Sequence, residues 1–175
     1  MVTIRTVRPG DIPAIQVIYA YEVEHGLASF EETPPDITEM ERRRAHIVSG
    51  RYPYIVATDG ADVVGYAYAS AYRPRPAYRF TVENSVYVAR HAHRRGVGKA
   101  LLSALIAECE AGPWRQMLAV IGDRENHGSI ALHTALGFSV VGIIESTGYK
   151  LGQWVDTVLM QRGLGPSSTA PPDAQ

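Results

Sequence analysis

Residues Arg94 to Lys99, RRGVGK, join a strand-like run to a helix-like run. The first backbone N–H groups of a helix have no partner within it and carry a positive partial charge, so they bind anions such as phosphate. Gly96 and Gly98 leave the approach to these groups open. Arg94, Arg95 and Lys99 add positive charge. The segment is therefore a candidate cradle for a pyrophosphate, and a basic solvent-exposed turn is the alternative.

Two common phosphate-binding motifs do not fit this segment. A P-loop has a glycine five residues before the position of Gly98 and Ser or Thr after the lysine, but this chain has His93 and Ala100 there. A dinucleotide-binding fingerprint has a further glycine three residues later, where this chain has Leu101. The sequence therefore excludes both motifs and leaves another phosphate-bearing ligand open.

A glutamate and a histidine are the candidate proton-transfer groups. Glu83 lies in the strand-like run TVENSVYV, where glutamate is unfavourable unless its face of the sheet is wet or functional. Partial burial would raise its pKa and suit it to act as a general base. His133 lies in the helix-like run HGSIALHTALG, and a side chain that titrates near neutral pH can donate or relay a proton. A solvent-facing carboxylate and a helix-surface histidine are the alternatives.

Periodicity, capping residues and glycine stops predict the elements that position these groups. Helices are predicted from a cap at Gly10 or Asp11 to about His25, from Asp36 to Gly50, and over 99–111 and 127–137. Strands are predicted over 3–7, 52–58, 63–71, 81–88, 116–122, 139–145 and 154–162. This order predicts a mixed α/β sheet flanked by helices, in a single domain of residues 1–162. Residues 163–175 are rich in Gly, Pro, Ser, Thr and Ala, which predicts a disordered tail.

Composition describes an ordinary soluble globular protein. The chain has 175 residues, 46% of them hydrophobic and 20% charged, with a net charge of -1, so nothing in the charge indicates nucleic acid or a membrane surface as a partner. It shows no signal-peptide pattern and no membrane-length apolar run, so we expect it in the cytoplasm. Cys109 lies on an apolar helical stripe and is expected to be buried and inert. The histidines lack the spacing of a zinc site, and no metal is expected.

Two segments together resemble a known family. RRGVGKALL, preceded by SVYV, is similar to the Arg/Gln-x-x-Gly-x-Gly/Ala motif of the GCN5-related N-acetyltransferases (GNAT), and NHGSIALHTALGF is similar to their Asn…Leu-(Tyr/His)-x-x-x-Gly-Phe motif. The resemblance covers Val2 to Arg162. LASFEETPP, YAYASAYRPRPAYRFTVENSVYV and GYKLGQWVDTVLMQ further resemble the branch that acetylates phosphinothricin, methionine sulfone and methionine sulfoximine.

This resemblance implies a fold and a reaction. The fold would be a mostly antiparallel central sheet, splayed in the middle and flanked by helices. The reaction would move an acetyl group from acetyl-CoA, the co-substrate, directly to the α-amino group of a small amino acid or analogue, and the chain would be a homodimer. Acetylation of protein N-termini or polyamines, and a catalytically silent acyl-CoA-binding module, are the alternatives.

The resemblance also assigns roles to residues. Glu83 would be the general base, and His133, or a water molecule, would protonate the departing sulfur. Donor contacts would come from Val86, Tyr87, Val88, Arg94, Arg95, Gly96, Val97, Gly98, Lys99, Asn126 and Ser129; the asparagine could equally be a helix cap. Substrate contacts would come from Phe30, Glu31, Arg73, Arg75, Asn84 and Ser85. Arg79 would be a third arginine facing the substrate, and Lys150 and Trp154 resemble branch positions near the pocket or the subunit interface, with the choice between these two roles left open.

Overall fold

The structure, a computed structural model, describes residues 2–172; residue 1 and residues 173–175 lie outside the described part. Its strands are β1 Val2–Thr6, β2 Tyr54–Asp59, β3 Asp62–Ala71, β4 Thr81–Val88, β5 Gln116–Gly122, β6 Ser139–Lys150 and β7 Gln153–Gly163. Its α-helices are α1 Ile12–His25, α2 Ile37–Ser49, α3 Val97–Glu110 and α4 His127–Ala135, and short 3-10 turns lie at Pro9–Asp11, Pro76–Tyr78 and Arg90–Ala92. None of these helices is long and apolar enough to cross a bilayer.

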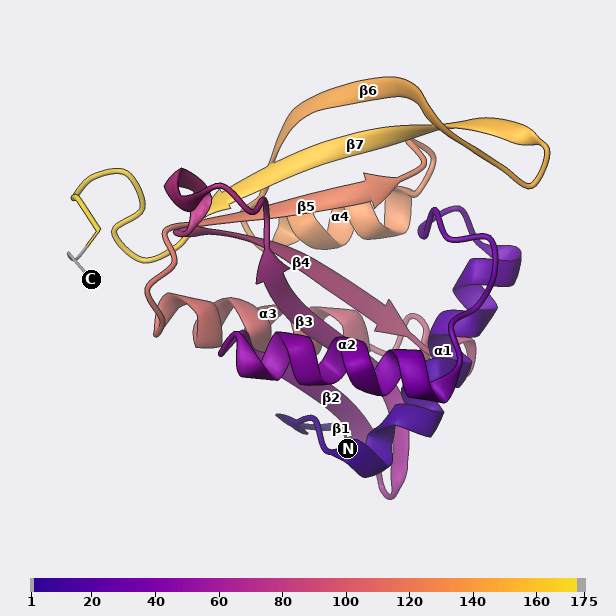
Figure 1. The fold of residues 1–175 in the computed structure, drawn as a ribbon. Helices are drawn as coiled ribbons and strands as arrows, with labels where there is room; N and C mark the ends of the chain where they lie inside the picture. Colours follow the sequence, from indigo (N-terminus) through magenta and orange to yellow (C-terminus); the bar gives the residue numbers. More distant parts are fainter. Residues whose placement is uncertain (1, 173–175) are drawn as a thin grey trace.

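The strands form one seven-stranded sheet in the order β1-β2-β3-β4-β5-β7-β6 (Figure 1). The β4–β5 pair is parallel, and the other neighbouring strands are antiparallel. The predicted mixed, mostly antiparallel sheet flanked by helices is confirmed.

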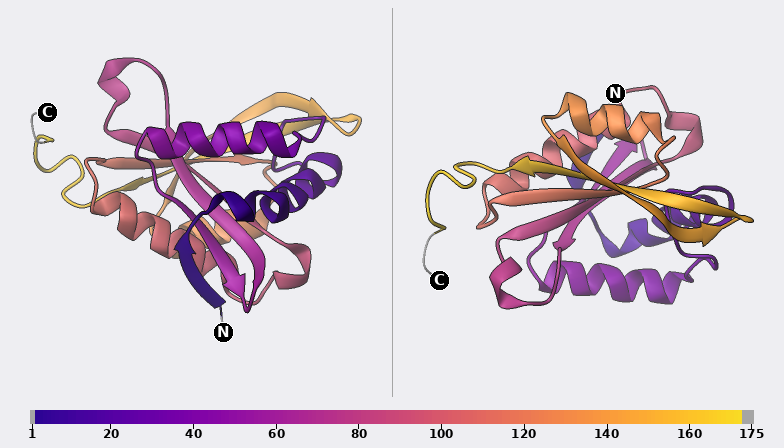
Figure 2. Two further views of the ribbon diagram at one scale, coloured as in Figure 1. Left: turned by 60° about the horizontal axis from the view of Figure 1, so that its bottom comes forward. Right: turned by 90° about the horizontal axis from the view of Figure 1, so that it is seen from above.

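Helices cover both faces of the sheet (Figure 2). On one face, α3 contributes Leu101, Leu102 and Leu105 to a core of buried aliphatic side chains. On the other face, α1 and α2 cover a second core that includes the buried tyrosines Tyr54 and Tyr66. Because side chains alternate between the faces of a strand, successive residues of a central strand face different cores.

The centre of the sheet is split between β4 and β5. Their pairing begins at Thr81↔Gln116 and ends at Asn84↔Ala119, although β4 continues to Val88. Beyond the last pair the two strands separate, so the predicted splay is present. We call this point the fork.

Local signals account for the element boundaries. Asp36 caps α2 by accepting a hydrogen bond from the N–H of Glu39 at 2.7 Å, as the capping-box spacing predicts. The bounds of β4 and β5 agree with the prediction. β6 runs five residues beyond the predicted end at 145, because a break in the pairing register around Ser146, which has φ 52°, lets the strand resume its pairing with β7.

The segment after β7 differs from the disordered tail predicted from residue 163. Gly163 still belongs to β7, and Leu164 is fully buried in the core below α3. Ser167 accepts a hydrogen bond from Nε2 of Gln116 at 2.8 Å. One apolar side chain and a few hydrogen bonds hold this Gly- and Pro-rich segment against the sheet, which composition does not reveal. Residues 173–175 of the predicted tail lie outside the described residues.

Candidate active site

Three adjoining pockets pass through the fork. An open pocket of about 550 Å³, here the donor pocket, lies between the end of β4 and the N-termini of α3 and α4. A second pocket of about 490 Å³, here the acceptor pocket, lies on the face covered by α1 and includes Glu83. A slot of about 60 Å³ lies between β4 and β5 beyond their last pair and shares Ala28 and Tyr87 with both pockets. A molecule in the donor pocket can therefore reach the acceptor pocket through the slot.

The N-terminus of α3 forms one wall of the donor pocket. Arg94 and Gly96 have left-handed backbone conformations, with φ 59° and 80°, which turn the chain sharply into the helix. Hydrogen bonding within the helix begins with the N–H of Ala100, which donates to the carbonyl of Gly96 at 3.0 Å, so the preceding N–H groups are available to a ligand. A Cβ on Gly98 would lie 3.4 Å from Leu132 and would narrow the pocket.

The basic residues of this turn divide between two places. Arg94 and Lys99 line the donor pocket. Arg95 lies outside its lining and pairs instead with Asp59, with 2.7 Å between Nη2 and Oδ2. Val97 also lines the pocket, but its side chain is buried in the core, so only its main chain can meet a ligand. An N-terminus with two cations and open amides fits the diphosphate expected from the sequence.

The last residues of β4 offer main-chain groups to the slot. The N–H of Ala89 donates to the carbonyl of Val64 at 2.9 Å. Because successive backbone N–H groups of a strand point to alternate sides, the N–H of Tyr87 also points toward β3. The N–H groups of Val86 and Val88 consequently face away from β3, toward the side that β5 has left. They can bind an extended polar chain, or the oxygen of an acyl group.

Asn126 and Ser129 begin α4 on the opposite wall of the donor pocket. Asn126 caps the helix, because its Oδ1 accepts a hydrogen bond from the N–H of Ser129 at 3.1 Å. Both residues also line the donor pocket and the slot. The helix-capping role of Asn126 is therefore observed. Because Asn126 also lines the donor pocket, the same residue can contact a molecule bound there.

His133 lies at the slot but has protein partners on both ring nitrogens. Its Nε2 is 3.0 Å from Oδ1 of Asn84, and its Nδ1 is 2.8 Å from the carbonyl oxygen of Ser129. Asn84 in turn donates from Nδ2 to the carbonyl of Leu118 on β5 at 2.9 Å. Burial lowers the pKa of His133, although the Ser129 carbonyl acts to raise it. Both neighbours of the ring are oxygen acceptors, so a ring that donates to both carries a proton on each nitrogen, whereas the neutral imidazole has one N–H and can donate to only one of them.

Glu83 is half-buried in the acceptor pocket. It is adjacent to Asn84 in β4, so the two side chains point to opposite faces of the sheet, and Glu83 shares its face with Ser85 and Tyr68. Burial raises the pKa of Glu83 above its ordinary value. A stronger base at this place is suited to accept a proton from an amine.

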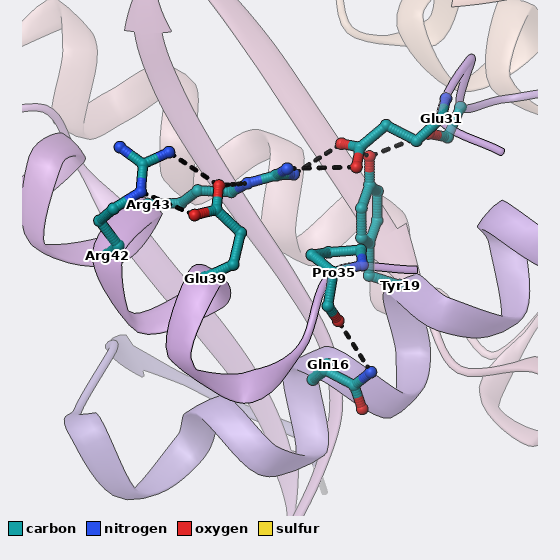
Figure 3. A network of polar contacts seen from close by, with 8 residues as sticks. Gln16, Tyr19, Glu31, Pro35, Glu39, Arg42 and Arg43 are labelled. Carbon is teal, nitrogen blue, oxygen red and sulfur yellow. Dashed lines mark hydrogen bonds and ion pairs between the residues drawn. The ribbon is translucent and has the colours of Figure 1, made fainter. Parts of the chain in front are cut away.

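The loop between α1 and α2, residues 26–36, forms another wall of the acceptor pocket through Phe30 and Glu31. Figure 3 shows Arg43 of α2 between Glu31 and Glu39. Arg43 donates two hydrogen bonds to Glu31, at 2.6 and 3.1 Å, and Tyr19 donates a third at 2.7 Å. Burial acts to raise the pKa of Glu31, but these hydrogen bonds keep it below its ordinary value. Glu31 is therefore charged and already paired within the protein.

The same loop is held from the β6–β7 side. Lys150, at the end of β6, is buried and donates from Nζ to the carbonyls of Gly26 at 2.8 Å and Ser29 at 2.6 Å. Phe30 packs on Gly148, where a Cβ would lie 2.6 Å from the ring. The role of Lys150, undecided from the sequence, is thus to anchor the wall of the acceptor pocket. Trp154 is exposed and packs edge-to-face on Tyr149.

The arginines predicted to contact substrate do not line these pockets. Arg73 lies over the ring of Tyr72 at 5.1 Å, and Arg79 lies over Phe80 at 4.4 Å. Arg75 is exposed and precedes the 3-10 turn Pro76–Tyr78. Of the other predicted substrate residues, Phe30, Glu31 and Ser85 line the acceptor pocket and Asn84 lines the slot.

Sequence reasoning missed several residues of the acceptor pocket. Tyr19, Ser29, Tyr68 and Thr157 supply hydroxyl groups to its lining. Tyr19 has the pattern of a core residue of α1, and Tyr68 that of an ordinary strand residue, so neither carries a local signal. Within residues 2–172 no cluster of His, Cys, Asp and Glu could hold a metal ion.

Comparison with known proteins identifies the fold and its relatives. The family model described as "Acetyltransferase (GNAT) domain" matches residues 4–159. The chain is 53% identical over 171 residues to a phosphinothricin N-acetyltransferase of Alcaligenes faecalis, covering 98% of this chain and 87% of that protein. It is 38% identical to an L-methionine sulfoximine/L-methionine sulfone acetyltransferase of Pseudomonas aeruginosa, covering 97% and 98%.

A solved structure agrees with both comparisons. The phosphinothricin acetyltransferase of Sinorhizobium meliloti, determined in complex with AcCoA, has a TM-score of 0.96 and 47% identity, covering 98% of this chain and 93% of that one. The fork, the open N-terminus of α3 and these similarities lead to one conclusion: the chain belongs to the GNAT family of acetyltransferases.

Proposed function

We propose that this chain transfers the acetyl group of acetyl-CoA to the α-amino group of a small amino acid or amino-acid analogue, in a direct reaction with both molecules bound. The observation that carries the proposal is the position of Glu83. Its half-buried carboxylate, with a raised pKa, lies in a pocket that a slot between β4 and β5 connects to the donor pocket. The substrates named for the relatives, phosphinothricin and the methionine sulfone and sulfoximine, are the leading acceptors.

Each part of the site has a task in this reaction. The N-terminus of α3, with Arg94 and Lys99, would hold the diphosphate of the donor. The N–H of Val86 would stabilise the negative charge that develops on the acyl oxygen. Glu83, directly or through water, would take a proton from the acceptor ammonium, so that its nitrogen can attack. Phe30 would cover the acceptor side chain.

The charge of the acceptor pocket favours a single amine over a polyamine. Glu83 and Glu31 both line it, which by itself would suit a polycation. However, Arg43 already pairs with Glu31, so Glu83 alone offers an uncompensated carboxylate. The hydroxyl of Tyr19 already donates to Glu31, but the hydroxyl of Thr157 also lines the pocket and can donate a hydrogen bond to a polar group such as a sulfone, a sulfoximine or a phosphinate.

The substrate class can be tested by measuring thiol release from acetyl-CoA with a panel of acceptors. The panel contains methionine sulfone, methionine sulfoximine, phosphinothricin, glutamate, spermidine and a peptide with an N-terminal alanine. We expect kcat/KM for one of the first three to exceed that for spermidine and the peptide by about tenfold or more, because the pocket's polar groups would be left unpaired by the others. Faster acetylation of spermidine or the peptide would contradict the assignment.

We also infer that the functional unit is a homodimer. β6 is an edge strand on which Val140, Val141, Ile143 and Ile144 are exposed. Ile143 and Ile144 are consecutive in a regularly paired part of the strand, so apolar side chains are uncovered on both of its faces. Exposed apolar edge strands are normally covered in soluble proteins. We propose that a second copy of the chain covers these exposed side chains of β6.

We also propose that the enzyme is located in the cytoplasm. Its recovery outside that compartment in cell fractionation would contradict this location.

A further inference from the structure

One polar side chain bridges the fork between β4 and β5. Asn84 belongs to the last residue pair before the strands separate. Its side chain is buried and crosses to the neighbouring strand, where Nδ2 donates to the carbonyl of Leu118 at 2.9 Å. A hydrogen bond at this position ties the strands together at the point where the slot begins.

The orientation of Asn84 depends on His133. The carbonyl oxygen Oδ1 of Asn84 lies 3.0 Å from Nε2 of His133 and accepts a hydrogen bond when that nitrogen carries a proton, so the amide is then held at both its ends. Nδ1 of His133 lies 2.8 Å from the carbonyl oxygen of Ser129, and the ring of Phe138 packs edge-to-face on the imidazole at 5.0 Å. The imidazole is therefore contacted on three sides, and its protonation decides which of its two nitrogens donates.

The end of α4 adds to this fixation. The N–H of Phe138 donates to the carbonyl of His133 at 3.1 Å, and the N–H of Gly137, at φ 84°, donates to that of Thr134 at 3.0 Å. This pair of bonds is the Schellman ending of a helix. The backbone of His133 is consequently part of a rigid helix terminus, and its ring projects from there to Asn84.

His133 and Glu83 lie on opposite sides of β4. Glu83 and Asn84 are consecutive in the strand, so their side chains point to opposite faces, and His133 contacts Asn84. The acceptor pocket contains Glu83 but not His133 in its lining. His133 can therefore influence the acceptor side through Asn84 and the strands that Asn84 joins.

We propose that His133 is a positioning residue: through Asn84 it fixes the fork of β4 and β5, and so the width of the slot in which the acetyl thioester meets the amine. This inference rests on the proposed acetyl transfer and differs from the acid role that the family resemblance implies. The C–N bond forms as the C–S bond breaks, with its electron pair leaving on sulfur. Two protons leave the ammonium, the first by way of Glu83. The thiolate, with a pKa of about 8.5, can take a proton from bulk water.

Glutamine at position 133 separates positioning from acid catalysis. The amide of His133→Gln can donate a hydrogen bond to Asn84 but has no proton that titrates near neutral pH. His133→Leu removes the contact with Asn84, and Asn84→Ala removes both that contact and the hydrogen bond to Leu118. His127→Leu, an exposed histidine of the same helix outside the pocket linings, is the matched control. Circular dichroism tests whether each variant is folded.

The readouts are the affinity for acetyl-CoA, measured by calorimetry, and the steady-state constants for methionine sulfone. We expect His133→Gln to keep kcat and its pH profile within about threefold, and His133→Leu and Asn84→Ala each to weaken acetyl-CoA binding by about tenfold, the size of one net hydrogen bond. The double variant His133→Leu/Asn84→Ala should lose no more than the worse single variant, because Asn84→Ala already removes the contact that His133→Leu removes. His127→Leu should match the wild type.

The opposite pattern would overturn the inference. If His133 is the acid, His133→Gln loses kcat by about 10² with unchanged acetyl-CoA affinity, and its pH profile loses one limb. Additive losses in the double variant would also contradict a shared contact. If His133→Leu does not fold, the comparison of His133→Gln with the wild type decides alone. Failure of the wild type to bind acetyl-CoA would overturn the proposed function instead, which keeps the two failures distinct.

Discussion

Glu83 combines two properties that rarely coincide in a surface carboxylate. It is half-buried, so its charged form is less well hydrated and its pKa is raised. It also lines a pocket large enough for an amino acid, and the slot that leads from the donor begins at the neighbouring residue, Asn84. The same burial that makes Glu83 a stronger base also makes its charge costly for the folded state.

Replacement of Glu83 should therefore stabilise the protein in a pH-dependent way. Because the folded-state pKa lies above that of the unfolded chain, which is about 4.3, folding favours the protonated form, and that contribution is lost as pH rises through the folded pKa. Glu83→Gln mimics the protonated form. It should raise the Tm above the folded pKa, with each kcal/mol giving about 2–4 °C in a domain of this size.

Thermal denaturation at a series of pH values measures this difference. The gain in Tm of Glu83→Gln should be present at about pH 8 and should vanish at about pH 3, which lies well below the unfolded-state pKa, so that both states of the wild type are protonated. A lower Tm for the variant at the higher pH would show that the carboxylate makes a stabilising contact. A gain that does not depend on pH would show that the effect has no electrostatic origin.

At the scale of elements, the sequence predicts most of the framework because the signals are local. Asp36 and Glu39 mark the start of α2, and β-rich runs mark β4 and β5 at their observed bounds. The extension of β6 beyond 145 was missed because a break in pairing around Ser146 interrupts the alternation on which the prediction rests. Only the partner strand shows that pairing resumes.

Contacts distant in sequence account for what was missed in the site. Lys150 contacts carbonyls of the α1–α2 loop more than a hundred residues earlier, and lysine ordinarily predicts an exposed position. Arg43 lies in the charged run ERRR, where one arginine cannot be distinguished from its neighbours. The positions of Glu83 at a pocket and of the glycine-rich turn at the start of α3 could be predicted. Glutamate is unusual in a β-rich run, and the RRGVGK segment has a recognisable pattern. The pairing of Arg95 with Asp59 could not be predicted, because it depends on where the β2–β3 hairpin places Asp59.

At the scale of the whole molecule, the exposed side chains of β6 predict a dimer of about twice the 19.1 kDa of one chain. Val141→Glu would place a charge within the proposed interface and should give the monomer, because burial of an unpaired carboxylate is strongly unfavourable. Val48→Glu, on the exposed side of α2, is the matched control. Light scattering coupled to size exclusion measures the mass. A monomeric wild type, or a dimer that Val141→Glu leaves intact, would contradict this interface.

The most direct test of the account compares binding with chemistry in one variant. Calorimetry gives the affinity for acetyl-CoA, and a single-turnover experiment gives the rate of acetyl transfer to methionine sulfone. We predict that Glu83→Gln binds acetyl-CoA as the wild type does but transfers the acetyl group about 10² or more times more slowly, as expected for loss of a general base. Glu108→Gln, which removes the same charge from the exposed side of α3, should transfer at the wild-type rate. Transfer by Glu83→Gln at the wild-type rate would contradict the assignment of Glu83 as the base.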